Sequence, residues 1–547
     1  MLILVFISGL ALLLFAMRQM EQALASLGKG QLQRALEYST RTPVQAVLLG
    51  TVVTAILQSS TLVGLMTMAF LGAGVLPFRN AIGVILGSNL GTTFTGYLVA
   101  WLGFKVELDQ GYTLLLGAGA LLVVLGRDES RVQQAGKLTM ALGFLLFALV
   151  LMKDSISFVL EHVDIAQLQQ VSLLAYFLFG LVFTAVIQSS SATMMITLSA
   201  MSSGILDLES SAAIVIGANL GTTSTVVLVS LKGSALKRQI AAVHVVFNVI
   251  VSALGLLALP WLLVFLQTVL HINDPLFDLV TLHSLINFCG ILLFLPFIDA
   301  FRNCIERWLP LPARPGLVIE QVGTEVPEAA LKAVEADVRT LLGDSVLLNA
   351  WRLEVLPARS CTRKVRLAKT TQSSYAELKD RENRLSDYIL ELQRVALSPE
   401  QVRRAQQLLV CIRDCLYSTK AVKDVESDLV RFRLESGVEV RTFINQLVGS
   451  VEALYAHALQ LLEAECSITG DDFRSMRDKV GDSHTTSNAA IYALIDQKGF
   501  KHDRASSALN INRELLLSAH SLINALQHFL LPGEQAATVS QWLSTRS

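Results

Sequence analysis

The sequence predicts an all-α membrane protein made of two inverted-topology repeats with interrupted helical hairpins, followed by a cytoplasmic α-helical bundle. The first observation behind this prediction is composition: 52% of the 547 residues are hydrophobic and the mean hydropathy is +0.53, above the usual range of soluble domains. The second is an uneven distribution of charge. The third is a pair of polar motifs that occurs twice inside long apolar segments.

Charge divides the chain into two parts. Residues 1–300 hold only 13 of the 44 Lys and Arg residues and 14 of the 45 Asp and Glu residues. We therefore expect a membrane domain over residues 1–305, a linker over 306–329 that includes the Pro-rich segment 309–315, and a soluble helical domain over 330–547. The net charge of −1 gives no reason to expect nucleic acid as a partner.

Apolar segments long enough to enter a bilayer define the membrane domain. Two of them, 43–75 and 171–205, are too long for one crossing and are interrupted near their centres by Gln-Ser-Ser. Each predicts two half-length helices joined at a polar tip. Such a hairpin is expected to line a pathway, because irregular backbone at membrane depth needs protein or water as a hydrogen-bond partner. The other expected spans are residues 2–17, 80–103, 111–126, 136–160, 210–231, 240–270 and 276–300.

The positive-inside rule orients these spans. If the seven single segments each cross once and the two hairpins return to their starting side, 11 of the 13 Lys and Arg residues before residue 300 face the cytoplasm. An odd number of crossings separates the hairpins, so repeat 2 (about 136–305) enters the membrane upside down relative to repeat 1 (about 1–126). This predicts a multi-pass protein of the cell (inner) membrane with a cytoplasmic C-terminal domain.

The duplicated motifs are the strongest functional signal. Thr54–Ser60 (TAILQSS) recurs as Thr184–Ser190 (TAVIQSS), and Gly87–Thr93 (GSNLGTT) recurs as Gly217–Thr223 (GANLGTT), in both cases 130 residues later. A hairpin tip places the carbonyl end of one half-helix beside the amide end of the next, which favour a cation and an anion respectively. With their neutral oxygens and hydroxyl and amide donors, the motifs suit Na⁺ and an oxyanion. The candidate binding residues are Gln58, Ser59, Ser60, Thr61, Asn89, Thr92, Thr93, Gln188, Ser189, Ser190, Ser191, Asn219, Thr222 and Thr223.

The four motifs contain no Asp or Glu, which argues against a Ca²⁺ cage and against acid–base hydrolysis. We therefore expect no enzyme activity, no cofactor and no metal beyond sodium as a coupling ion. The glycines Gly87, Gly91, Gly217 and Gly221 are expected to allow close backbone approach or a local break in the helix that follows each hairpin. Small polar residues in membrane helices also mediate packing, and for each motif alone that alternative stays open. The joint duplication at one offset favours a binding site.

Two further polar pairs lie on later spans. His244 with Asn248, and His283 with Asn287, are spaced i,i+4 and therefore face one direction on a helix. Such a pair can stabilise the bundle through an interhelical hydrogen bond or can serve a proton or ion path. The sequence leaves both interpretations open.

Residues 1–305 resemble the type II sodium/phosphate cotransporter family, of the bacterial type with a C-terminal PhoU-like domain. The resemblance rests on the Gln-Ser-Ser motif of each repeat, on the Gly-x-Asn-Leu-Gly-Thr-Thr segment that follows each, and on the His-x-x-Phe-Asn stretch at His244–Asn248. Repeat 1 has no counterpart of that stretch. The resemblance implies Na⁺-coupled transport of inorganic phosphate by alternating access, with the two Gln-Ser-Ser tips forming a shared substrate and sodium site.

The C-terminal region resembles the PhoU-like helical domain more weakly, through Leu408–Asp414 and Lys423-Asp424. This implies regulation of transport or of phosphate signalling, and a cytoplasmic oligomerisation bundle is the alternative. The implied partners are inorganic phosphate, Na⁺ and the lipid bilayer, while a homo-oligomer through either domain stays open. Two other functions also stay open: a sodium symporter for another small anion, and a membrane-tethered phosphate sensor that does not transport.

Overall fold

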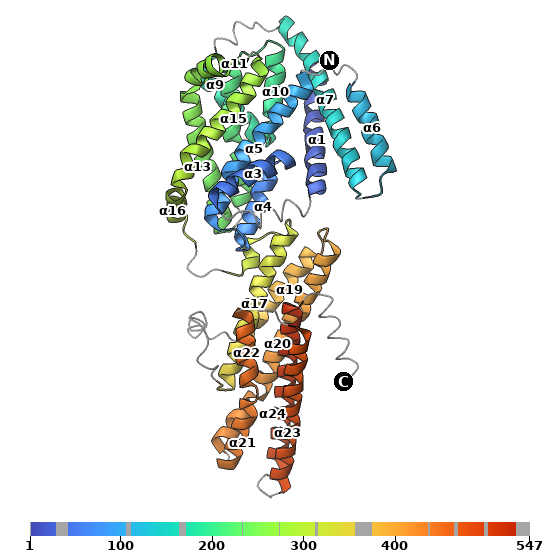
Figure 1. The fold of residues 1–547 in the computed structure, drawn as a ribbon, viewed down its shortest axis with the longest axis vertical. Helices are drawn as coiled ribbons and strands as arrows, with labels where there is room; N and C mark the ends of the chain where they lie inside the picture. The colour runs from blue at the N-terminus through green and yellow to red at the C-terminus, as the bar shows by residue number, and fades with distance from the viewer. Residues whose placement is uncertain are drawn as a thin grey trace. The chain divides into compact units, whose positions relative to one another are not determined.

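The computed structural model describes residues 2–28, 42–104, 111–128, 130–162, 171–231, 234–272, 274–311, 316–355, 375–435, 438–463, 469–496 and 502–531. Over these residues the chain is helical and contains no strand. Contacts divide it into two units, Met1–Pro315 and Gly316–Ser547 (Figure 1). The division falls within the segment expected to be the linker, whose residues 312–315 lie outside the described ranges.

The first unit contains helices that are long enough to cross a membrane and helices that are shorter. Six segments are long and apolar enough to cross a membrane, so the prediction of an all-α membrane protein is confirmed at this level: Leu4–Gly28, Phe78–Trp101, Arg131–Met152, Leu208–Leu231, Ala235–Leu257 and Pro275–Trp308. Over the described residues the element order is α1 (Leu2–Gly28), α3 (Pro43–Leu57), α4 (Ser60–Gly72), α5 (Phe78–Phe104), α6 (Gly111–Leu125), α7 (Arg131–His162), α9 (Leu173–Ile187), α10 (Ser190–Ser202), α11 (Leu208–Gly221), α12 (Thr223–Leu231), α13 (Ala235–Leu257), α14 (Leu259–Phe265), the π-helical turn η1 (Leu266–Leu270), α15 (Pro275–Phe294), the 3₁₀ turn η2 (Leu295–Phe297) and α16 (Ile298–Trp308).

Several predicted spans differ from these helices. The span expected over 276–300 begins at Pro275 and continues through η2 into α16, which ends at Trp308, and the one expected over 136–160 begins at Arg131. The segment expected over 2–17 continues to Gly28, because its later turns pack with the buried side chains of Met20 and Ala23. The span expected over 210–231 is two helices, α11 and α12, separated by a single turn residue. The span expected over 240–270 is also divided, and α14 restarts with Pro260 in its first turn, a residue that cannot donate a backbone hydrogen bond.

Each hairpin begins with a capping signal that is readable in the sequence. Thr42 and Gln45 form a capping box at the start of α3: the Thr42 hydroxyl accepts from the Gln45 amide at 3.3 Å, and Gln45 Oε1 accepts from the Thr42 amide at 3.2 Å. Pro43 occupies the first helical position, where no backbone donor is needed. Ser172 is the N-cap of α9, and its side chain accepts from the Ala175 amide at 3.3 Å.

The same helix pairs pack in the two halves of the first unit. Helix α3 lies along α5, and α9 lies along α11. In Figure 1, α3 and α4 lie in the lower part of this unit, whereas α9, α10 and α11 lie in its upper part. Helices α13 and α15 each contact both α5 and α11. They therefore join the two halves, whereas α1 and α6 both pack on α7.

Glycines set the close approach of both helix pairs. A Cβ atom built on Gly87 would lie 2.0 Å from the carbonyl oxygen of Val47, and one built on Gly217 would lie 2.0 Å from that of Phe177. Both contacts leave no room for any other side chain, and they differ by the same offset of 130 residues as the motifs. The expected close backbone approach is therefore confirmed in each repeat.

The expected local break is wrong for the first repeat. Helix α5 continues without interruption through Gly87–Thr93. In the second repeat α11 ends at Gly221, and Thr222 forms a turn before α12 begins at Thr223. The glycines thus serve packing in both copies, and only the second copy interrupts its helix.

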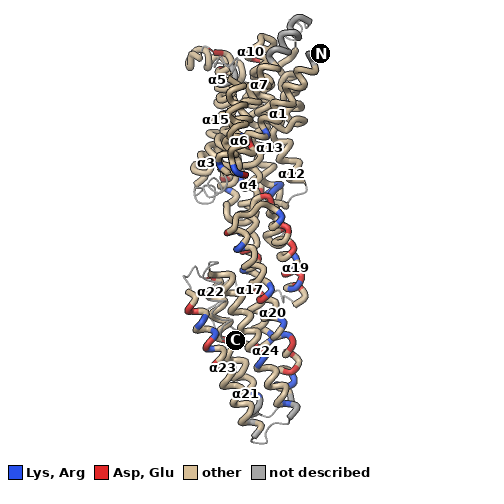
Figure 2. The backbone as a smooth tube through the Cα atoms, turned by 90° about the vertical axis from the view of Figure 1, so that its right-hand side faces the viewer, with Lys and Arg blue, Asp and Glu red and all other residues tan. Residues whose placement is uncertain are grey.

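The second unit is a bundle of amphipathic helices, as expected. Figure 2 shows Lys, Arg, Asp and Glu at many positions along these helices and at few positions in the first unit. Helices α20 and α24 pack along each other, with α17 against α20 and α23 against α24. Its elements are η3 (Val318–Gln321), α17 (Pro327–Arg352), α19 (Tyr375–Leu392), α20 (Pro399–Glu435), α21 (Val438–Gly449), α22 (Glu452–Glu463), α23 (Gly470–Asp496) and α24 (His502–Leu530).

A buried polar seam runs through the core of the second unit. The hydroxyls of Ser345 and Thr419 are 2.5 Å apart, Asn349 donates to the Ser418 hydroxyl at 3.2 Å, and the Ser418 and Ser518 hydroxyls are 3.0 Å apart. These residues belong to α17, α20 and α24. Because each buried hydroxyl needs a partner, the seam fixes the register of the three helices.

Candidate functional site

The Gln-Ser-Ser motifs form two breaks with nearly the same backbone geometry. Gln58 follows the last residue of α3 with φ 56°, and Gln188 follows the last residue of α9 with φ 60°. In the described part of the chain only four non-glycine residues have positive φ, and these two are among them. A left-handed conformation costs a non-glycine residue about 1 kcal/mol or more, and such strain is typical of functional sites.

Hydrogen bonds close both breaks in the same way. The backbone amide of Gln58 donates to the Thr54 carbonyl at 2.7 Å, and that of Gln188 donates to the Thr184 carbonyl at 2.7 Å. The next residue begins the second half-helix in each copy. Ser59 accepts from the amide three residues on at 3.4 Å, and its counterpart Ser189 does so at 3.2 Å. Each tip is therefore a left-handed cap followed at once by a serine N-cap.

The tip of the first hairpin is buried and its glutamine is held on both sides. Gln58 is 8% exposed and Ser59 is 9% exposed. Thr95 of α5 donates its hydroxyl to Gln58 Oε1 at 2.6 Å, and Gln58 Nε2 donates to the Ala55 carbonyl at 2.5 Å. These bonds tie the tip of the hairpin to the helix that carries the second motif.

The tip of the second hairpin lies in a different environment. Gln188 is exposed, and its side chain makes no hydrogen bond with any described residue. Thr225, the counterpart of Thr95, keeps a buried hydroxyl without a partner. Instead, Thr184 bonds across the hairpin to Thr193, with 2.7 Å between the two hydroxyls. The first hairpin has Val63 at the position equivalent to Thr193.

Thr95 and Thr225 extend the site beyond the candidates expected from the sequence. Both continue the second motif, as Gly-Thr-Thr-Phe-Thr in one copy and Gly-Thr-Thr-Ser-Thr in the other, at the common offset. A motif extended by two residues would have included them. Their roles differ in the two copies, however, because only Thr95 reaches a glutamine of the tip.

The repeated asparagines are each bonded by one of the two helices that join the halves of the first unit. Asn89 Oδ1 lies 3.1 Å from His244 Nε2 of α13, and Asn219 Nδ2 donates to Asn287 Oδ1 of α15 at 3.3 Å. Asn89 is 3% exposed and Asn219 is 5% exposed. The expected polar pairs therefore make interhelical hydrogen bonds, through the histidine in one pair and the asparagine in the other.

Several buried polar atoms around these asparagines have no protein partner. Asn89 Nδ2, Asn248 Oδ1 and both ring nitrogens of His283 are buried and unpartnered among the described residues. Asn248 and Asn287 each donate to the carbonyl of the histidine one turn earlier, at 2.9 Å in both cases. Unpartnered groups at membrane depth indicate places that water, an ion or a substrate occupies.

The threonines of the second motif present oxygen lone pairs. Thr92 donates to the Asn89 carbonyl at 2.7 Å, Thr93 to that of Leu90 at 2.7 Å, Thr222 to that of Ala218 at 3.0 Å and Thr223 to that of Leu220 at 2.8 Å. Because each hydroxyl proton is used within its own helix, the oxygen that remains is an acceptor. Uncharged acceptor oxygens suit a monovalent cation such as Na⁺.

The two motifs of each repeat lie against each other. A Cβ atom built on Gly91 would lie 2.6 Å from Thr54 Cβ, and one built on Gly221 would lie 2.8 Å from Thr184 Cβ. Across the repeats, α10 packs on α5 and α4 packs on α13. The remaining candidates lie at the start of the second half-helices, α4 and α10, and are partly exposed: Ser60, Thr61, Ser190 and Ser191.

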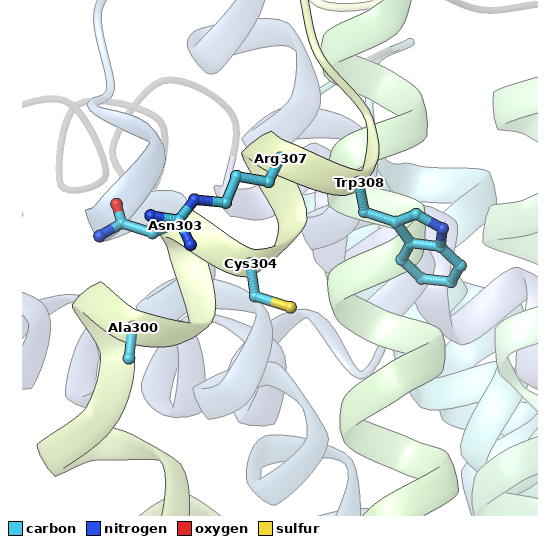
Figure 3. A pocket seen from close by; sticks show the side chains of 5 residues that line it. All are labelled: Ala300, Asn303, Cys304, Arg307 and Trp308. Atoms are coloured by element: carbon cyan, nitrogen blue, oxygen red, sulfur yellow. The ribbon is translucent and has the colours of Figure 1, made fainter.

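A surface hollow of the first unit lies apart from the motifs. Its volume is about 530 Å³, and its lining residues are Ala300, Asn303, Cys304, Arg307 and Trp308. All five belong to α16, as Figure 3 shows, and none belongs to a motif. We therefore place the candidate site at the hairpin tips and not in this hollow.

Comparison with known proteins places the motifs in a family context. Residues 12–154 and 165–267 match the model of a family described as Na⁺/Pi-cotransporter. YqeW, an uncharacterized protein of Bacillus subtilis (strain 168), is 33% identical over 321 residues, which cover 56% of this chain and 99% of the relative. No solved structure matches the chain at a significant level.

Two further relatives carry a functional name. A protein of Escherichia coli (strain K12) with the provisional name inorganic phosphate export protein YjbB is 26% identical over 298 residues, 54% of this chain and 53% of the relative. The protein of that name from Salmonella typhimurium is 25% identical over 306 residues, 55% of this chain and 54% of the relative. This chain thus aligns with about half the length of each of the two proteins.

Proposed function

The chain belongs to the Na⁺/Pi-cotransporter family, and we propose that it is a secondary transporter that moves inorganic phosphate across the membrane, coupled to Na⁺, by alternating access. The observation that carries the proposal is the pair of equivalent breaks, each a left-handed glutamine followed by a serine cap. Each break lies beside a Gly-x-Asn-Leu-Gly-Thr-Thr segment, so both repeats contribute to one substrate and sodium site.

The chemistry of the tips supports an anion and a cation together. The second half-helix of each hairpin begins at a serine, Ser60 or Ser190, and its amide end favours an oxyanion. Acceptor hydroxyls such as those of Thr92 and Thr222 supply neutral oxygen ligands for Na⁺. No Lys, Arg, Asp or Glu lies in any of the four motifs, so neither ligand would face a fixed charge of the protein there.

Two features support alternating access through inverted repeats. The two hairpins lie toward opposite ends of the first unit (Figure 1). Their tips are also unequally accessible, since Gln58 is buried while Gln188 is exposed. A site reached from one side at a time requires such a difference between its two halves.

For the second unit we propose a cytoplasmic regulatory role, as a PhoU-like helical domain. Its support is the all-α bundle and the weak resemblance of α20, and the family match ends at residue 267, before this unit begins. No group of three or more His, Cys, Asp or Glu side chains arranged to hold a metal is found among its described residues. Regulation through a bound metal is therefore not part of the proposal.

The direction of flux follows from the gradients. A symporter moves phosphate inward when the Na⁺ gradient dominates and outward when the internal phosphate concentration is high enough. We propose outward flux under phosphate excess, because the relatives from Escherichia coli and Salmonella typhimurium are provisionally named for phosphate export.

The test is radiolabelled phosphate flux in proteoliposomes of uniform orientation, with the sodium gradient imposed in each direction. Flux should follow the sodium gradient, and Gln58→Ala or Gln188→Ala should each reduce it by about tenfold or more, because each change removes a ligand group from the shared site. Gln267→Ala, an exposed glutamine of η1, is the matched control and should leave flux unchanged. Flux that ignores both the sodium gradient and the two substitutions contradicts the proposal.

Two controls separate the alternatives. Competition by sulfate or a small carboxylate that equals competition by phosphate would assign another anion as the substrate. Phosphate binding without net flux in the same vesicles would assign a sensor.

A further inference from the structure

The interface between α23 and α24 in the second unit is polar. Arg477 of α23 donates to the Asn524 side chain of α24. Near the other end of the interface, Asn512 of α24 donates to the His484 carbonyl at 3.0 Å and to Asn488 Oδ1 at 2.8 Å. The helices are therefore antiparallel, and these residues of α23 recur at helical spacing along one face. Interfaces inside a bundle are ordinarily apolar, so this stripe needs a reason.

The titratable groups that act on His520 are basic. His520 of α24 lies between the two bonded ends, and burial together with the nearby Arg477 and His484 lowers the pKa of His520 to about 4. Asp414 of α20 is a carboxylate that interacts with Arg477: burial raises its pKa, while Arg413 and Arg477 act in the opposite direction. Burial and the two neighbouring basic groups thus both favour the uncharged imidazole of His520.

A glycine leaves space in the middle of the stripe. Gly481 lies one turn after Arg477 and three residues before His484, on the face of α23 that meets α24. A Cβ atom built there would meet no atom within 4 Å. The contacts Arg477–Asn524 and Asn488–Asn512 bracket this glycine on α23 and His520 on α24. Gly481 is half-buried, and these contacts set the open space beside it at the level of His520 along the two helices.

Two hydrogen-bond donors around this space have no partner. Arg477 Nε is buried and unpartnered among the described residues, and so is His484 Nδ1. Because Asn488 uses its Oδ1 to accept from Asn512, its amide nitrogen donates to His484 Nε2 at 3.1 Å. That bond leaves the ring proton of His484 on Nδ1, so the unpartnered atom is a donor. The group is thus short of acceptors.

We propose that Arg477, His484 and His520 form a binding site for a small tetrahedral oxyanion of the phosphate type, placed beside Gly481. The planar guanidinium and the two imidazoles can supply N–H donors to its oxygens, which is the recognition that arginine-based phosphate sites use. The anion would connect α23 to α24 by charge-assisted hydrogen bonds. The proposal rests on the second unit alone and holds whether or not the first unit transports phosphate.

Binding should also take up a proton. An anion beside His520 favours its imidazolium form, and by linkage a proton on His520 favours the anion. The titratable groups that interact with His520 are Arg477 and His484 on α23. Arg477 in turn interacts with Asp414 on α20, which also interacts with Arg413, and Arg413 interacts with His528 on α24. Loss of the His520 proton uptake is therefore a signature that a purely structural role would not produce.

The experiment uses the purified full-length protein with both Gln58→Ala and Gln188→Ala, in sodium-free buffer, so that the proposed transport site does not contribute. Calorimetric titration with inorganic phosphate should show one site. Gly481→Met, which fills the space, and Arg477→Gln, which removes the donor, should each weaken binding by about tenfold or more. His520→Gln should abolish the proton uptake, which is read from titrations in two buffers of different ionisation enthalpy.

Matched controls keep the result interpretable. Gly343→Met changes a glycine of α17 that also has open space beside it, and Arg513→Gln changes an exposed arginine of α24; both should bind as the parent does. Gly481→Ala, which adds one methyl group to a helix, is a second variant that keeps the fold while narrowing the space. A parallel titration with ATP distinguishes free phosphate from the phosphate group of a nucleotide. Binding that is absent for both ligands, or unchanged by Gly481→Met and Arg477→Gln in folded protein, overturns the proposal.

Discussion

The two hairpins of the first unit have the same backbone and different surroundings. Gln58 and Gln188 have φ angles of 56° and 60°, and each forms the left-handed C-cap of the first half-helix. Yet the Gln58 side chain is buried and accepts from Thr95, whereas the Gln188 side chain is exposed. Among the described residues the Gln188 side chain and the Thr225 hydroxyl have no hydrogen-bond partner. Gene duplication therefore copied the local structure of the tip but not its contacts.

A second difference between the repeats lies outside the hairpins. Helices α13 and α15, which join the two halves, contribute His244 to Asn89 in one repeat and Asn287 to Asn219 in the other. A chemically similar pair of tips in unlike environments is what a transporter needs if its site opens to one side at a time. In the proposed mechanism the exposed second tip and the buried first tip would be the two halves of one such state.

The largest expected effect tests what the two repeats share. Gly87→Leu and Gly217→Leu should both prevent stable folding, with a cost of about 3 kcal/mol or more, because the added Cβ alone would lie 2.0 Å from a carbonyl oxygen. The measurement is the melting temperature and the monodisperse fraction in detergent. Gly117→Leu is the control, since a Cβ there meets nothing within 4 Å. Tolerance of one substitution but not the other would show that the helix pairs are not equivalent.

The next effect tests the difference in accessibility. In a background without the native cysteines, two of which, Cys289 and Cys304, are exposed, a membrane-impermeant maleimide should label Gln188→Cys at least about tenfold faster than Gln58→Cys. The reason is that only the first tip is buried by its neighbours. Labelling is followed by mass shift on gels of solubilised protein. Equal labelling rates of the two variants in solubilised protein would show that the two tips are equally accessible and would contradict this prediction.

A third effect concerns the bond that holds the first tip. Thr95→Val should destabilise the protein by about 1–2 kcal/mol, because it leaves Gln58 Oε1 buried without a donor. Thr225→Val should be nearly neutral, since its hydroxyl already lacks a partner. Chemical denaturation of the two variants in one detergent compares them directly. A larger loss for Thr225→Val would mean that its hydroxyl is used in the dominant state.

The smallest effect would bring the two hairpins closer in chemistry. Thr193→Val should cost about 1 kcal/mol by removing the partner of the Thr184 hydroxyl. The reciprocal change, Val63→Thr, offers the unpartnered Thr54 hydroxyl a partner and should lie within about 0.5 kcal/mol of the parent. Thermal melts of both variants test this. Equal destabilisation by the two changes would show that the Thr184–Thr193 bond adds nothing.

Much of the site could be predicted because its signals are local. The left-handed break falls at Gln58 and Gln188, where the apolar segments are interrupted, and capping residues such as Thr42 and Ser172 stand directly before the helices they begin. These features depend on residues within one turn of each other. Thr95 lies two residues beyond the end of the repeated motif at Thr93, so the motif alone does not predict its contribution.

The sequence by itself determined that the chain is a helical membrane protein with two copies of one interrupted hairpin, because hydropathy, caps and glycine spacing act over short distances. Only the tertiary structure decided which copy is buried, which threonine reaches a glutamine, and that α5 stays continuous while α11 ends at Gly221. The helices that join the two halves also bond the repeats differently, through His244 to Asn89 and through Asn287 to Asn219. Burial is a property of the assembled neighbours, so two nearly identical segments have different environments.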